Sequence, residues 1–116
     1  MNNIKNEISF EDFTKVDIRI GTIIGVYDFP KAYKPAYQLL IDFGNLGTKK
    51  SSAQITELYT KEELLNKQIV AIVNFKNKQI ANFISECLVL GIENNQHKIV
   101  LLQASKPKLK NGEQVG

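Results

Sequence analysis

NKQIVAIVNFKNKQIANFISECLVLG, residues 66–91, is the stretch that decides the fold. It contains two short apolar runs, residues 69–73 and 87–91, which predict two strands buried inside a closed sheet. The connection between them, residues 74–85, carries Lys76 and Lys78, several amide side chains and no acidic residue. A simple turn needs fewer residues, so this connection is predicted to be either a binding surface or a solvated loop.

Upstream of this stretch, residues 16–28 alternate along a long predicted strand. Ile24 falls on the side that we expect to be buried. Gly21, Ile23 and Gly25 fall on the side that we expect to face outward, where the glycines would let the strand bend sharply, as a small barrel requires.

Two more strands are predicted before residues 66–91, and three more are predicted within or after these residues. Residues 36–43 alternate again, and residues 48–55 are unusually polar, so that strand is predicted to lie at a sheet edge or to face a ligand. Gly44 and Gly47 mark a hairpin-like break between the two. The later strands are predicted at residues 69–75, 86–92 and 98–103, and the tail after them is predicted to form a hairpin or to be solvated.

Two helix-start signals stand out. Ser9 followed by Asp12, and Thr60 followed by Glu63, have the spacing of a capping box. The second predicts a helix over residues 60–66.

The first signal predicts a short helix that carries Phe10 and Phe13 on one face. So short an element cannot bury two rings by itself. They are predicted to pack on the barrel or on a partner chain.

The order of three strands, a short helix and then two or three strands predicts an all-β chain with the OB-fold. The OB-fold is a five-stranded Greek-key barrel, here with N-terminal and C-terminal extensions and one domain over residues 1–116. An SH3-like barrel is also short and all-β, but the helix between the third and fourth strands favours the OB-fold.

Composition limits the functional classes. The chain has 116 residues, 43% of them hydrophobic and 23% charged, as expected for one globular domain. It has no run that could cross a membrane and no secretory signal, so we expect no membrane insertion and a cytoplasmic location. Cys87 is predicted to be a small buried apolar residue, and with His97 as the one histidine no metal site or cofactor is predicted.

No catalytic residue set is evident either. Ser51 and Ser52 have no histidine near them in sequence, and His97 has no orienting carboxylate beyond Glu93. We therefore expect that the chain is not an enzyme.

The placement of charge is more informative than the net charge of +3. Residues 29–41, 43–56 and 64–85 contain lysines and no acidic residue. If these segments converge in space, they form a cationic face that attracts phosphate.

Three motifs then carry a resemblance over nearly the whole chain: DIRIGTI (residues 17–23), SSAQIT (residues 51–56), and NKQIVAIVNF followed by IANFISECLVLG (residues 66–91). In order and spacing they resemble the tRNA-binding domain family, which includes stand-alone dimeric proteins and domains appended to methionyl- and phenylalanyl-tRNA synthetases. Cys87 and Leu88 point to the branch described as export-related chaperones. Where many relatives have glycine this chain has Asn82, which also tolerates left-handed backbone angles.

The resemblance implies a homodimer that binds folded tRNA by shape. Its RNA-binding face would consist of Lys49, Lys50, Ser51, Ser52, Asn74, Lys76, Lys78 and Ser85. The chaperone branch implies, as an alternative, binding of unfolded polypeptides or preproteins in protein export. That contact, near the dimer interface, would use exposed apolar side chains around Phe10, Phe13, Phe29 and Phe83.

Overall fold

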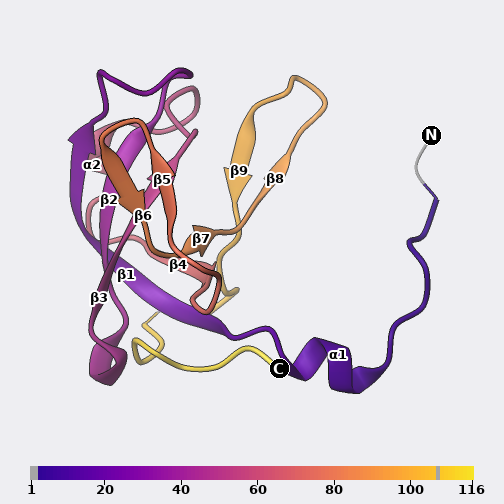
Figure 1. Cartoon of the computed structure of the whole chain (residues 1–116). Helices are drawn as coiled ribbons and strands as arrows, with labels where there is room; N and C mark the ends of the chain where they lie inside the picture. The colour runs from indigo at the N-terminus through magenta and orange to yellow at the C-terminus, as the bar shows by residue number, and fades with distance from the viewer. Residues whose placement is uncertain (1–2, 107) are drawn as a thin grey trace.

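The computed structural model describes residues 3–106 and 108–116. Its elements are α1 (Phe10–Thr14), β1 (Ile18–Asp28), β2 (Tyr37–Asp42), the 3-10 helix η1 (Gly44–Leu46), β3 (Thr48–Ala53), α2 (Lys61–Leu64), β4 (Gln68–Ile72), β5 (Lys78–Ile80), β6 (Phe83–Ser85), β7 (Leu88–Val89), β8 (Gly91–Glu93) and β9 (Ile99–Leu101) (Figure 1). Five strands form one antiparallel sheet in the order β3-β2-β1-β4-β7, and β5-β6 and β8-β9 are separate hairpins. The sheet curls into a nearly closed barrel, which confirms the predicted OB-fold.

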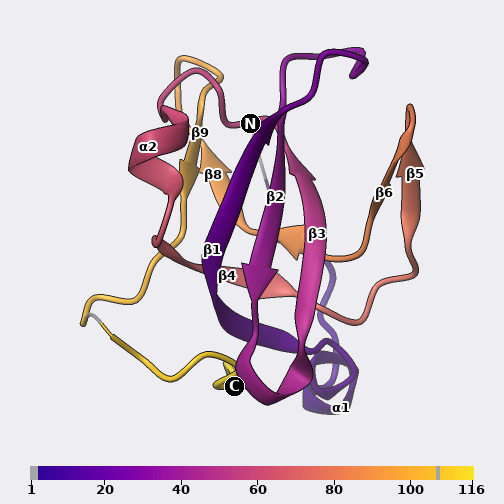
Figure 2. The same cartoon turned by 90° about the vertical axis from the view of Figure 1, so that its left-hand side faces the viewer.

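The long strand β1 joins the two halves of the barrel. Its first half pairs with β4 and its second half with β2 (Figure 2). Thr22 pairs with both strands. The register with β2 shifts between Ile23 and Gly25, so one residue bulges out of the ladder. This bulge provides the sharp bend that the sequence requires of the strand.

The structure also corrects the predicted faces of β1. Ile23 is fully buried in the core, whereas Ile24 is 43% exposed. Gly21 faces the interior, because a Cβ atom on it would lie 2.6 Å from Cε1 of the buried Phe43. The predicted sides of these residues are therefore wrong. Apolar residues occupy both sides of the strand, so the alternation alone could not distinguish the faces.

The polar strand β3 is an edge of the sheet, as one of the two alternatives predicted. It closes the barrel against the segment between β6 and β7. The Glu86 amide donates to the Lys50 carbonyl at 2.7 Å, and the Lys50 amide donates to Glu86 Oε1 at 2.8 Å. The barrel is thus closed at this edge by hydrogen bonds to one backbone acceptor and one side-chain acceptor. These bonds do not depend on apolar side chains, of which β3 has few.

The predicted connection at residues 74–85 is a β5-β6 hairpin that projects from the barrel (Figure 2). Its turn has a positive φ of 53° at Ala81, the residue before Asn82. The predicted strand at residues 86–92 is also divided, because β7 pairs with β4 whereas β8 pairs with β9.

Both predicted helix caps are present. Ser9 Oγ accepts from the Asp12 amide at 3.2 Å, and Thr60 Oγ1 accepts from the Glu63 amide at 3.2 Å, each with the reciprocal carboxylate bond. Helix α2 ends at Leu64, which is buried in the core. Helix α1 lies beside the barrel at the end of an extended N-terminal segment (Figure 1). Its Phe10 ring is exposed.

The C-terminal tail pairs, through main-chain hydrogen bonds, with the first half of β1, which β2 leaves unpaired. The Gly112 amide donates to the Ile20 carbonyl at 2.8 Å, and the Ile20 amide donates to the Glu113 carbonyl at 3.0 Å. The tail is thus neither a separate hairpin nor fully solvated, and its pairing partner is a strand far from it in sequence.

The barrel interior holds the main core, which is built from β1, β2, β3, β4, α2 and later segments: Ile23, Leu39, Ile41, Phe43, Ala53, Ile55, Leu64, Ile69, Ala71, Cys87 and Leu101. A smaller cluster lies outside it, under the β5-β6 hairpin. Within the described ranges, no helix has the length and apolar character needed to cross a membrane.

Candidate nucleic-acid interface

Strand β3 and the β5-β6 hairpin bring several of the predicted RNA-binding residues together. The Ser52 amide donates to Ser85 Oγ at 3.1 Å, which fixes the hairpin against the strand. Between them lies a groove of about 420 Å³, lined by polar and apolar side chains: Ser52, Phe75, Lys76, Lys78, Ile80, Ser85, Cys87 and Leu88. The lysines of the hairpin are exposed at this groove.

The predicted serines have different places at the groove. Ser51 is fully buried, and its hydroxyl donates to the Cys87 carbonyl at 3.1 Å. Ser85 is buried too, and its hydroxyl accepts from Ser52 and donates to the same Cys87 carbonyl at 3.3 Å. These two hydroxyls bind the Cys87 carbonyl, and Ser85 lines the groove together with Ser52, which is partly exposed.

Asn74 also has a structural place. Its side-chain oxygen accepts from the Asp17 amide at 2.9 Å, and its nitrogen donates to the Lys15 carbonyl at 2.8 Å. The amide therefore ties the end of β4 to the start of β1. This bond fixes where the chain leaves the barrel to form the hairpin.

Phe29 and Phe83 are buried, so the expectation that they are exposed is wrong. Their ring centroids are 5.4 Å apart, and together with Ala36 they form the smaller core cluster. Lys50 Nζ lies 5.4 Å from the centroid of Phe83, a distance suited to a cation–π contact. The cluster thus supports the hairpin and one of the lysines beside it.

Cys87 is the buried apolar residue that the sequence predicts. Its thiol lies in the core, and burial raises its pKa to about 11. The thiolate is the nucleophilic form of cysteine, so this thiol is unreactive near neutral pH.

This pKa predicts a pH dependence of stability. The folded state favours the neutral thiol. The stabilisation that this preference provides is therefore fully present below the pKa of the unfolded thiol and is lost as pH rises towards about 11. Between about pH 7.5 and 10.5 the wild-type chain should lose about 2 kcal/mol more unfolding free energy than Cys87→Ala. Urea unfolding of both proteins at both pH values measures this difference, and an equal loss in the two would contradict it.

A second hollow of about 280 Å³ adjoins the groove and shares Ser52 and Ile80 with it. Tyr33 and Lys34 line it on the other side. Neither Tyr33 nor Phe75 was predicted from the sequence to be a functional residue. The signal was present, because each is an aromatic residue directly followed by a lysine.

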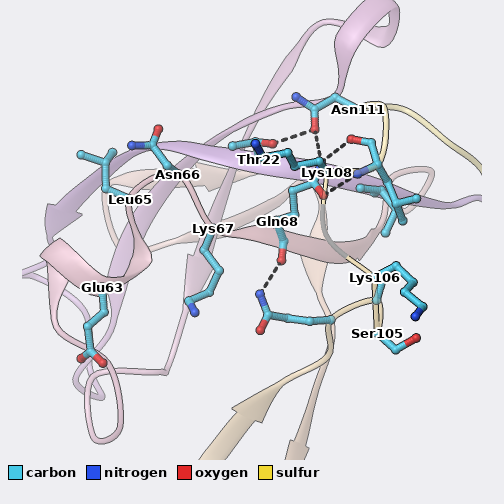
Figure 3. A pocket seen from close by; sticks show the side chains of 14 residues that line it. Thr22, Glu63, Leu65, Asn66, Lys67, Gln68, Ser105, Lys106, Lys108 and Asn111 are labelled. Carbon is cyan, nitrogen blue, oxygen red and sulfur yellow. Dashed lines mark hydrogen bonds between the residues drawn. The ribbon is translucent and has the colours of Figure 1, made fainter.

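The largest hollow, about 740 Å³, lies elsewhere, under the C-terminal tail (Figure 3). Its polar groups bind one another: Gln68 Nε2 donates to the Leu109 carbonyl at 2.6 Å, and Thr22 Oγ1 donates to Asn111 Oδ1 at 2.7 Å. These bonds dock the tail on the barrel. Lys67 lines this hollow instead of the groove, so the predicted convergence of all the lysine-rich segments holds only in part.

No metal centre is formed by the side chains of residues 3–106 and 108–116, where no three His, Cys, Asp or Glu residues gather. The groove between β3 and the β5-β6 hairpin therefore offers a ligand lysine, hydroxyl, aromatic and aliphatic groups.

Comparisons with known proteins agree with this architecture. Residues 18–114 match the family described as "Putative tRNA binding domain". The CsaA chaperone protein from Picrophilus torridus is 50% identical, with a TM-score of 0.88 over 95% of this chain and 100% of that one. The chaperone CsaA from Bacillus anthracis is 48% identical, with a TM-score of 0.90 over 96% and 100%.

Among longer relatives, the methionine–tRNA ligase of Chlorobium chlorochromatii is 33% identical over 111 residues. That match covers 96% of this chain, but the chain spans only 15% of the ligase. The shared part is therefore one domain of a much longer protein. Since the family match extends over most of its length, this chain belongs to the tRNA-binding domain family.

Proposed function

We propose that this protein binds folded tRNA by shape, without catalysis, through a lysine face formed by β3 and the β5-β6 hairpin. The observation that carries the proposal is the groove itself, where Lys76 and Lys78 from the hairpin meet Ser52 of β3 with no acidic side chain in the lining. The exposed Lys50 and the partly exposed Lys49 extend this face along β3.

The electrostatics favour a phosphate ligand. Glu86 is the acidic residue closest in sequence to the floor of the groove, and its carboxylate is held by the Lys50 amide. Among the ion pairs of the described residues, none joins Glu86 to a lysine of this face. Lysine contacts to the RNA backbone give affinity without sequence preference, because phosphates carry no base information.

A salt titration tests the proposal. Binding to total tRNA should weaken with salt along a log–log slope of about −3 to −5, which corresponds to roughly four to six neutralised phosphates. Absence of tRNA binding, or binding that is insensitive to salt, would contradict the proposal. An unfolded polypeptide titrated in parallel serves as the comparison.

Polypeptide binding is the second candidate function, as for a chaperone in protein export. Two observations favour it: the similarity to the CsaA chaperones, and the exposed Ile4, Ile8 and Phe10 of the N-terminal segment. Contiguous exposed apolar surface is typical of sites that contact other proteins. Retention of an unfolded polypeptide in the parallel titration, at salt that abolishes RNA binding, would support it.

We also propose a homodimer and a cytoplasmic location. Phe10 and Phe13, whose ring centroids are 6.1 Å apart, form an aromatic pair on α1, in which Phe10 is exposed and Phe13 is partly buried. Replacing both with alanine should shift the mass in sedimentation equilibrium from dimer towards monomer. Leu46→Ala, which also removes an exposed apolar side chain, serves as the control. An unchanged dimer in the double variant would place the interface elsewhere.

A further inference from the structure

The groove and the hollow beside it share a feature that phosphate binding alone does not require. Each presents an exposed aromatic ring next to a lysine. Phe75, which is 53% exposed, precedes Lys76 in the groove, and Tyr33, which is 97% exposed, precedes Lys34 in the hollow. An aromatic face offers no strong hydrogen bond to a phosphate, but it suits a flat, unsaturated ring.

The two ring–lysine pairs belong to one continuous surface. Ser52 and Ile80 line both cavities, so the groove that contains Phe75 adjoins the hollow that contains Tyr33. The groove and hollow have volumes of about 420 and 280 Å³ and open to solvent, which leaves room for a nucleobase in each.

We propose that this surface binds two neighbouring unpaired nucleotides of single-stranded RNA, with one base stacked on Phe75 and the other on Tyr33. Lys34, Lys76 and Lys78 would contact the phosphates beside them. Stacking requires unpaired bases, because base pairs in a helix cover their faces with their neighbours. The inference rests on the proposed RNA binding and adds to it a preference for a single-stranded part of the RNA.

Charge favours RNA over a polypeptide as the occupant. The residues that line the two cavities include three lysines, Lys34, Lys76 and Lys78, and no aspartate or glutamate. A ligand that carries a negative charge beside each flat apolar ring matches this pattern. RNA has that chemistry in every nucleotide, whereas an unfolded polypeptide has no regular negative charge.

The test measures binding of fluorescein-labelled hexauridylate and hexaadenylate by anisotropy, with total tRNA in parallel. Phe75→Leu and Tyr33→Leu should each weaken binding of the hexanucleotides by roughly 10-fold, since stacking of a base on an aromatic ring is lost. The salt slope should stay unchanged, because no lysine is removed. Phe75→Trp should retain binding, since it keeps an aromatic face.

Tyr27→Leu is the matched control, because it removes an exposed aromatic ring on β1, outside both cavities. Circular dichroism melting verifies that each variant is folded. If tRNA binds with a steep salt slope but the hexanucleotides do not bind, or bind the leucine variants equally well, the stacking inference is wrong while the proposed function stands. If neither RNA binds and an unfolded polypeptide binds in a Phe75-dependent way, both are wrong.

Discussion

Replacing Lys76 and Lys78 together with alanine should weaken binding to total tRNA by about 30-fold at moderate salt, if each phosphate contact contributes about 1 kcal/mol. Both side chains are exposed on the β5-β6 hairpin and line the groove. The salt slope should fall by about two, one for each lost lysine contact. The weakening should be similar for different tRNAs, because phosphates are the same in all of them.

A second double variant with the same loss of charge provides the control. Lys61 and Lys98 lie outside the groove and pair with Asp28 at 3.0 Å and Glu57 at 3.9 Å. Lys61→Ala with Lys98→Ala should leave tRNA binding within about two-fold of wild type, because exposed ion pairs contribute little. If both double variants weaken binding equally, net charge alone explains it and the lysine face is assigned wrongly. Loss of folding in the first would mean that the hairpin lysines are structural.

Local sequence rules predicted those parts of the fold that local interactions determine. Both capping boxes could be read from residues three apart, because the bonds form within one turn. The alternation predicted for residues 36–43 is confirmed, since Leu39, Ile41 and Phe43 are buried whereas Leu40 and Asp42 are only partly buried.

Long-range features could not be predicted in the same way. The burial of Phe29 depends on Phe83, which is distant in sequence. The pairing of the tail with β1 uses main-chain groups of Gly112 and Glu113, which leave no side-chain pattern to recognise. Neither contact has a local periodicity, so both required the three-dimensional structure.

The candidate site was predicted in outline through the family resemblance, but the roles of its members were not. Ser51, Ser85 and Asn74 have side chains that can contact RNA or hold the backbone equally well. Here their hydrogen bonds lie within the protein, and only the structure distinguishes the two uses. The exposed rings of Phe75 and Tyr33 needed the structure for the same reason, since most aromatic residues are buried.

The corrected face of Gly21 leads to the largest expected effect on stability. A Cβ atom at this position would lie 2.6 Å from Phe43 Cε1 and 2.7 Å from Ile41 Cγ2, both of which are buried and cannot move away. Gly21→Val should therefore lower the free energy of unfolding by about 3 kcal/mol, through overpacking of the core. Urea unfolding measures this loss as a shift of the midpoint. The slope of the unfolding free energy against urea concentration is taken to be the same for the variant and the wild-type chain.

Gly25→Val is the matched control on the same strand. A Cβ atom there would meet the Tyr27 ring, with the hydroxyl oxygen at 2.8 Å, but this side chain is exposed and can rotate into solvent. Valine also suits an extended strand better than glycine does. We therefore expect Gly25→Val to change stability by less than about 1 kcal/mol. If Gly21→Val were instead as stable as the wild-type chain, Gly21 would face outward, as the alternation predicted, and its placement against Phe43 would be wrong.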